Sequence, residues 1–112
     1  TAFSAKKSYL EQNPEIIQSF TNALQKGMDY VNSHTPEEIA QIIQPQFAET
    51  DFTQITTIVK RYYEQDTWKE NLIFEQDAFE LLQDILMEAG ELEQKVPYEQ
   101  LVIKNYAENA VQ

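Results

Sequence analysis

Three helix-start signals in the first half of the chain constrain its fold more than any other feature. Asn13-Pro14 pairs a side chain that can accept from free backbone N–H groups with a proline, which is tolerated at the first helical position. Thr35-Pro36-Glu37-Glu38 predicts a capping box, in which Thr35 caps the helix and Glu38 reaches back to it. Asp51 begins a third cap-like segment. Apolar residues at three- and four-residue steps follow these signals, so we predict an all-α chain of about five to six helices.

The spacing also predicts where each helix begins, ends and faces the core. Gly90 can end a helix because it adopts the left-handed conformation without strain, and Pro45 stops one because it has no N–H. The predicted helices are Ser4 to Leu10, Pro14 to about Ser33, Thr35 to Pro45, Asp51 to about Glu64, Glu75 to Ala89 and a short one from Val96-Pro97-Tyr98-Glu99, with a weakly amphipathic tail from Asn105 to Gln112. The predicted inward residues are Ile17, Phe20, Leu24, Met28 and Val31, then Ile39, Ile42 and Ile43, then Ile55, Ile58, Val59 and Tyr62, and finally Phe79, Leu82, Ile85, Leu86 and Ala89. Thr1-Ala2-Phe3 and Leu101-Val102-Ile103 are the only short strand candidates, and neither has a convincing partner.

Charge and composition exclude several classes of function. The 19 acidic and 8 basic residues give a formal net charge of −11, which would repel a nucleic-acid backbone or an anionic membrane surface. There is no cysteine for disulfide or thiol chemistry. Thr1-Ala2-Phe3 resembles the middle of a longer sequence, so the absence of a targeting signal says nothing about a parent protein.

Residues that could carry catalysis or hold a metal lack the partners they would need. His34 is the only histidine and lies at a predicted helix end, where it can interact with unpaired carbonyls. Asp77, Glu80, Asp84 and Glu88 lie near one face of a helix, but no Glu-x-x-His element accompanies them, which favours a solvated face. We therefore expect no enzyme activity, no cofactor and no metal site.

The aromatic group formed by Tyr62, Tyr63 and Trp68 has two interpretations. Large apolar side chains usually fill cores, which favours packing at a helix end. Aromatic residues also line small-molecule clefts, so the same group can be a wall that faces a ligand. Asp66 is expected to cap the turn that follows.

Several segments, in order along nearly the whole chain, resemble one family. They are Tyr9-Leu10-Glu11-Gln12-Asn13-Pro14-Glu15, Phe20-Thr21-Asn22-Ala23-Leu24-Gln25-Lys26-Gly27, His34-Thr35-Pro36-Glu37-Glu38-Ile39-Ala40, Gln65-Asp66-Thr67-Trp68, Phe79-Glu80-Leu81-Leu82-Gln83-Asp84-Ile85, and Glu88-Ala89-Gly90-Glu91-Leu92 with Val96-Pro97-Tyr98. Together they resemble the C-terminal part of the solute-binding proteins of nitrate, sulfonate, taurine and pyrimidine-precursor importers, the NMT1/THI5-like group. Phe74-Glu75 departs from the pattern, because relatives often have a serine or a similar cap there.

The resemblance implies a parent protein with a two-lobed α/β fold, the type II periplasmic-binding-protein fold. Such a protein binds a small solute outside the cytoplasm, as a periplasmic protein or a cell-surface lipoprotein, and delivers it to an ABC permease. Residues 1–112 would be a single helical unit that covers the sheet of one lobe, and most ligand contacts would lie upstream. Thr67 and Trp68 are the candidate ligand-binding residues, because their turn combines polar and aromatic groups.

Two other hypotheses compete with a solute-binding fragment. An autonomous helical interaction module predicts a monomer without a large apolar patch. The fragment hypothesis predicts the reverse, with exposed apolar helix faces through which the chain self-associates. An enzyme of thiamine-pyrimidine synthesis is the third hypothesis, and the single histidine and missing cysteines disfavour it.

Overall fold

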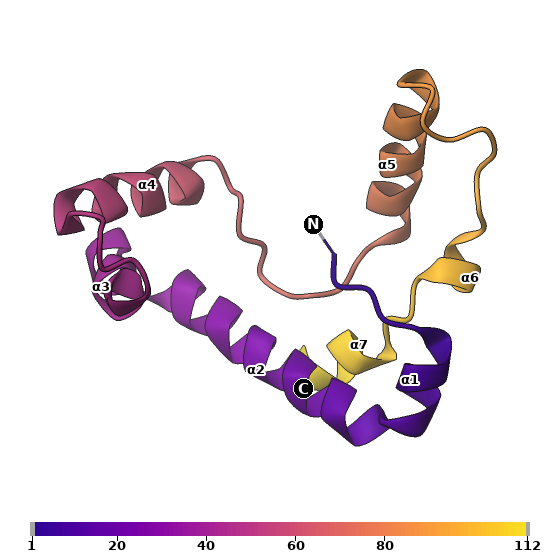
Figure 1. The fold of residues 1–112 in the computed structure, drawn as a ribbon, viewed down its shortest axis with the longest axis horizontal. Helices are drawn as coiled ribbons and strands as arrows, with labels where there is room; N and C mark the ends of the chain where they lie inside the picture. The colour runs from indigo at the N-terminus through magenta and orange to yellow at the C-terminus, as the bar shows by residue number, and fades with distance from the viewer. Residues whose placement is uncertain (1, 112) are drawn as a thin grey trace. The chain divides into compact units, whose positions relative to one another are not determined.

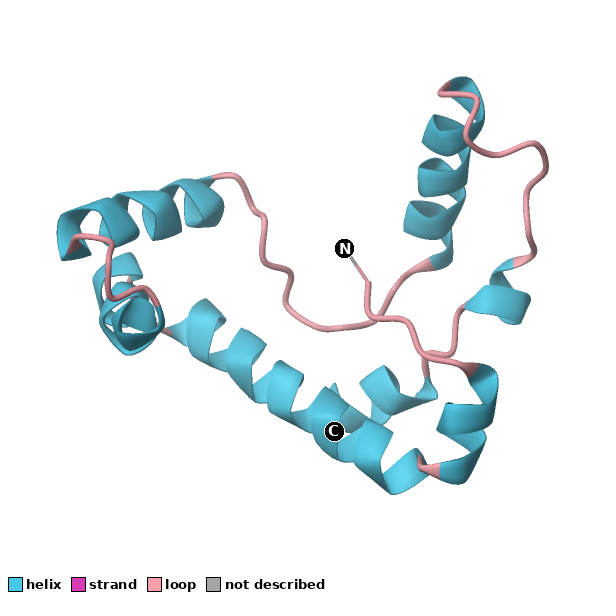
Figure 2. Ribbon diagram, in the orientation of Figure 1, coloured by secondary structure: helices cyan, strands magenta, loops and turns pink. Residues whose placement is uncertain are grey.

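The computed structural model describes residues 2–111, and every regular element in that range is helical (Figures 1 and 2). The prediction of an all-α chain is confirmed, and neither strand candidate is a strand where it is described; Thr1 lies outside the described residues. The tail, which was predicted to be only weakly amphipathic, forms a further helix, α7, up to Val111. Gln112 also lies outside the described residues. The elements are α1 (Lys7–Gln12), α2 (Pro14–Ser33), α3 (Pro36–Ile43), the 3₁₀ turn η1 (Gln44–Gln46), α4 (Phe52–Glu64), α5 (Gln76–Glu88), α6 (Tyr98–Leu101) and α7 (Asn105–Val111).

Two of the predicted N-caps form as expected. Thr35 Oγ1 accepts from the backbone N–H of Glu38 at 3.3 Å, and the Glu38 carboxylate accepts from the backbone N–H of Thr35 at 2.8 Å. These bonds from Thr35 lower the pKa of the Glu38 carboxyl, because they stabilise its charged form. Asp51 Oδ2 accepts from the backbone N–H of Thr53 at 3.1 Å. Both helix starts are therefore fixed by side chains close in sequence.

The prediction for the first helix is wrong at both ends. Ser4 is not its cap: α1 begins at Lys7, after Lys6, and runs two residues beyond Leu10 to Gln12. Asn13 Nδ2 donates to the carbonyl of Tyr9 at 3.1 Å, so the Asn13 side chain satisfies a backbone group at the end of α1.

Helices α4 and α5 end in the same backbone motif. After α5, the N–H of Gly90 bonds to Met87 O at 3.0 Å and the N–H of Glu91 bonds to Leu86 O at 2.9 Å, with Gly90 at φ 76°. After α4, Asp66 takes the place of the glycine, with φ 53°. This pattern is a Schellman motif, so the prediction that Gly90 ends its helix in the left-handed conformation is confirmed. Asp66 occupies the equivalent left-handed position at the end of α4.

The structure contains two compact units, and one of them spans residues 22–71. It holds most of α2, all of α3 and α4, and the segment that follows α4. Its core is the buried set Ile39, Ala40, Ile55 and Val59, with Tyr30, Val31, Ile43 and Trp68 packed against it. Three residues predicted to face this core do not, since Ile42 is 62% exposed, Ile58 is 48% exposed and Tyr62 is 47% exposed.

The other unit consists of residues 1–21 and 72–112. Phe79 of α5 is buried there, edge-on to Phe74 and Tyr98, whose hydroxyl donates to the carbonyl of Phe74. The buried Gln83 amide bonds both to the N–H of Val96 at 2.7 Å and to its carbonyl at 3.1 Å.

The rest of the apolar face of α5 is uncovered. Leu82 is 44% exposed and Ile85 is 54% exposed, so the prediction that they lie inside is wrong. Leu81 and Leu86 of the same helix are also exposed. Phe79 and Gln83 of α5 contact the segment that returns from this helix, and that segment leaves the exposed leucine and isoleucine side chains uncovered.

Candidate ligand site around Trp68

The turn after α4 places the two candidate residues, Thr67 and Trp68, in different settings. The N–H of Thr67 bonds to the carbonyl of Tyr62 at 3.1 Å and closes the Schellman motif, while the Thr67 side chain is exposed. Trp68 is half-buried, packs on the core of residues 22–71 and lies with its ring centroid 5.8 Å from that of Tyr62. Packing is thus one role of Trp68, as one of the two interpretations of the aromatic group predicts.

Trp68 also lines a small hollow within the same unit. The hollow has a volume of about 190 Å³ and is lined by Val31, Asn32, Tyr63, Asp66, Trp68 and Glu70. Thr67 does not line it. The structure therefore brings Trp68 together with Tyr63 and with two carboxylates at one surface, and it leaves Thr67 beside that surface.

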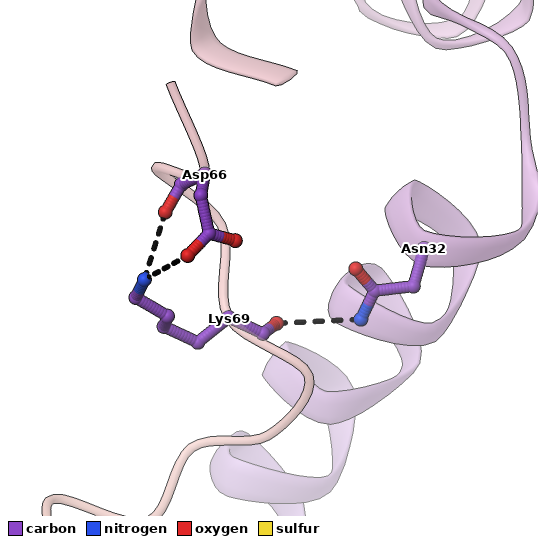
Figure 3. A network of polar contacts seen from close by, with 3 residues as sticks. All are labelled: Asn32, Asp66 and Lys69. Carbon is purple, nitrogen blue, oxygen red and sulfur yellow. Dashed lines mark hydrogen bonds and ion pairs between the residues drawn. The ribbon is translucent and has the colours of Figure 1, made fainter. Parts of the chain in front are cut away.

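A polar network joins one side of this hollow to α2 (Figure 3). Asn32 Nδ2 donates to the backbone carbonyl of Lys69 at 3.3 Å. The Lys69 ammonium donates to the backbone carbonyl of Asp66 at 2.9 Å and to its carboxylate Oδ2 at 2.6 Å. Both ends of this ion pair are largely exposed, so it contributes on the order of 0–1 kcal/mol to stability.

Gln25 of α2 bonds to the backbone of Glu70, one of the residues that line the hollow. Its side chain is buried, and its Nε2 donates to Asp29 Oδ1 at 2.9 Å and to the backbone carbonyl of Glu70 at 3.3 Å. Its Oε1 is buried without a hydrogen-bond partner in the structure. Gln25 thus ties the segment around Glu70 to α2. Sequence reasoning missed it, although a polar residue next to the inward-facing Leu24 is a detectable signal.

A larger hollow lies along α4 but offers less chemistry. It has a volume of about 480 Å³ and is lined by Thr50, Asp51, Thr53, Gln54, Thr57, Ile58 and Arg61. The hydroxyl of Thr57 donates to the carbonyl of Thr53 at 2.8 Å, and Asp51 caps the helix. The hollow beside Trp68 is the better candidate because it combines aromatic and acidic side chains, whereas the larger hollow has no aromatic lining residue.

The residues considered for catalysis or metal binding have structural partners. His34 Nδ1 lies 2.8 Å from the carbonyl of Tyr30, and the two rings stack with centroids 3.6 Å apart, which confirms its role at the end of α2. Asp84 pairs with Lys95 at 2.5 Å on the exposed side of α5. Among residues 2–111, no group of three or more His, Cys, Asp and Glu side chains is placed to hold a metal ion. No helix in this range is both long and apolar enough to span a membrane.

Comparison with known proteins gives one informative relative. The chain is 37% identical over 108 residues to a protein of Bacillus subtilis (strain 168) named "Putative binding protein YtlA". The match covers 96% of this chain and 32% of YtlA, so the chain spans about a third of the length of that relative. No protein-family model matches the chain, and no solved structure matches it.

Proposed function

We propose that this chain is part of the substrate-binding component of an ABC importer for a small organic solute. The observation that carries the proposal is the match of nearly the whole chain to YtlA, which is named as a binding protein. The resemblance to the NMT1/THI5-like group supplies the finer part of the proposal: a solute of the sulfonate, nitrate, taurine or thiamine-pyrimidine type, an ABC permease as partner, and a site of action outside the cytoplasm. A binding role, rather than catalysis, also agrees with the structural partners of His34 and Asp84.

The exposed apolar helix faces support the idea that the 112 residues belong to a longer protein. Ile42, Leu81, Leu82 and Ile85 are each at least 44% exposed although they lie at helical spacing on apolar faces. Such faces are stabilising only when something covers them, because exposed apolar surface costs roughly 25 cal/mol per Å² relative to burial. We propose that a scaffold outside these residues covers them, in a two-lobed parent protein.

Ligand screening by thermal shift on the full-length protein tests the function. A solute that binds the folded state stabilises it by mass action and so raises the melting temperature. The stabilisation is about 2.7 kcal/mol at a ligand concentration 100 times Kd. We expect a shift with a solute of one of the proposed types. If a broad panel of these solutes leaves the melting temperature unchanged while the protein is folded, the proposed function is wrong.

The alternative, an autonomous helical interaction module, makes a different prediction for the isolated chain. A module is monomeric at all concentrations, whereas a chain with uncovered apolar faces self-associates. The exposure of Leu82 and Ile85 favours the second behaviour. Light scattering over a wide concentration range distinguishes them, and a strict monomer would favour the module.

A further inference from the structure

We propose that the hollow beside Trp68 binds the ammonium group of a small solute. This inference rests on the proposed binding function and deepens it, because it names the chemical group that the site takes. The lining residues are two aromatic rings, two carboxylates, an amide and one aliphatic side chain. None of the residues that line the hollow is basic.

The lining residues match the chemistry of an organic cation. The carboxylates of Asp66 and Glu70 attract a positive charge and accept hydrogen bonds from an N–H. Tyr63 and Trp68 present aromatic rings, which attract ammonium groups within about 6 Å of the ring centroid, and methylated ammonium groups are commonly bound in this way. An anion would instead meet two carboxylates, in a chain that already carries a net charge of −11.

The protein already holds an ammonium group on Asp66. Lys69 Nζ lies 2.6 Å from Asp66 Oδ2 and 2.9 Å from the Asp66 carbonyl oxygen, so these two oxygens form a geometry that binds an N–H donor. The two side chains are 67% and 82% exposed, and such a pair is weak. Lys69 does not line the hollow, so this pair shows that Asp66 accepts from an ammonium group, and a solute ammonium would compete with a weak partner.

The surroundings of the hollow hold its lining in place without a ligand. Asp66 is fixed by the Schellman motif, since its N–H bonds to Tyr63 O at 3.2 Å. The backbone carbonyl of Glu70 accepts from Gln25 of α2, and Trp68 is anchored on the core of its unit. A site whose backbone and aromatic wall are already positioned loses less entropy when a ligand binds.

The size of the hollow limits the ligand to a small group. Its volume of about 190 Å³ is slightly larger than a cavity of about 150 Å³ that holds benzene, and it is smaller than the pockets that take drug-sized molecules. A trimethylammonium group or a short primary amine fits this space. Among the proposed solute types, nitrate and simple sulfonates lack such a group, whereas taurine carries a primary ammonium group.

Trp68 provides a direct assay, because it is the only tryptophan in the chain. The 112-residue chain is titrated with tetramethylammonium chloride and with propylamine hydrochloride at constant ionic strength, and the emission of Trp68 is recorded. tert-Butanol serves as the neutral probe and sodium methanesulfonate as the anionic probe. We expect a saturable change in emission with the two ammonium probes and none with the other two.

Two matched variants test the role of the carboxylate. Asp66→Asn keeps a residue that tolerates the left-handed conformation but removes the charge, and we expect it to weaken ammonium binding by about tenfold. Glu49→Gln removes one negative charge from an exposed residue that does not line the hollow, and it should leave binding within about twofold. Glu70→Gln is a second variant at the site, and far-UV circular dichroism confirms that each variant retains its helices.

Three results would overturn the inference. The first is an equal loss of ammonium binding in Asp66→Asn and Glu49→Gln, because it would mean that the overall negative charge of the chain attracts the probes and the hollow does not. The second is saturation by tert-butanol or methanesulfonate at the same concentrations, and the third is no response of Trp68 to either ammonium probe. Each of these would leave the proposed function standing if the full-length protein still shows a ligand-dependent melting temperature, and the ligand site would then lie elsewhere.

Discussion

The two glycines of the chain make a paired test of the helix geometry, because the same substitution should have opposite effects at them. Gly27 lies inside α2 with ordinary helical backbone, whereas Gly90 follows α5 with φ 76°. A Cβ built at either position meets no atom within 4 Å, so steric clash is absent from both cases. Only the backbone conformation distinguishes Gly27→Ala from Gly90→Ala.

The expected magnitudes follow from that backbone difference. Alanine inside an exposed helix is more favourable than glycine by about 0.8–1.0 kcal/mol, so Gly27→Ala should stabilise the chain by about that amount. Alanine in the left-handed conformation costs about 1–2 kcal/mol, and the reduced freedom of the unfolded chain returns about 0.4–1 kcal/mol. Gly90→Ala should therefore destabilise the chain by about 1 kcal/mol.

Thermal and urea unfolding of the 112-residue chain, followed by circular dichroism at fixed protein concentration, measures both effects. A change of 1 kcal/mol shifts the melting temperature of a domain of about this size by roughly 4–8 °C. We expect an increase for Gly27→Ala, a decrease for Gly90→Ala, and nearly additive effects in the double variant because the sites lie in different units. Changes of the same sign in both variants would refute the assignment of Gly90 to a strained helix end.

Four further substitutions test the caps and the core. Thr35→Ala removes the cap of α3 and should lower the free energy of unfolding by about 1 kcal/mol in urea titrations; no loss would mean that the capping box is not formed in solution. The pKa of the Glu38 carboxyl is lowered in the folded chain from its ordinary value of 4.5, so the charged carboxylate stabilises the fold at pH values above 4.5. This contribution is lost as the pH falls through the lowered pKa, so the difference in melting temperature between wild type and Glu38→Gln should shrink below pH 4.5. A difference that stays constant with pH would contradict this. Ile55→Val should cost about 0.5–1.5 kcal/mol because Ile55 is 4% exposed, while Ile42→Val, at 62% exposure, should change stability by less than about 0.5 kcal/mol; equal costs would contradict the assigned core.

Helix ends were predictable where a side chain close in sequence satisfies the backbone. Thr35 and Asp51 cap their helices as predicted, and Gly90 takes the left-handed conformation, because each of these interactions lies within a few residues. Ser4 failed as a cap, since nothing in the local sequence alone separates a start there from one at Lys7.

Inward faces were less predictable, because periodicity shows that a helix has an apolar face but not what covers it. Ile39 and Ile55 are buried where α3 packs on α4, while Leu82 and Ile85 lie at equally good spacing on α5 and remain exposed. The candidate site was likewise predictable in its local sequence but not in its long-range contacts. The sequence singled out Trp68, but the approach of Asn32 to Lys69 joins residues 37 positions apart, which no local pattern predicts.

Hydroxyl-radical footprinting can show whether the exposed apolar faces are covered in a longer binding protein. Labelling of Leu82 and Ile85 is compared between the 112-residue chain, at concentrations where it is monomeric, and the full-length protein. Ile39, which is 3% exposed, serves as the internal control and should be protected in both. We predict that Leu82 and Ile85 are labelled in the isolated chain and protected in the full-length protein; equal labelling of these two residues in both would contradict the claim.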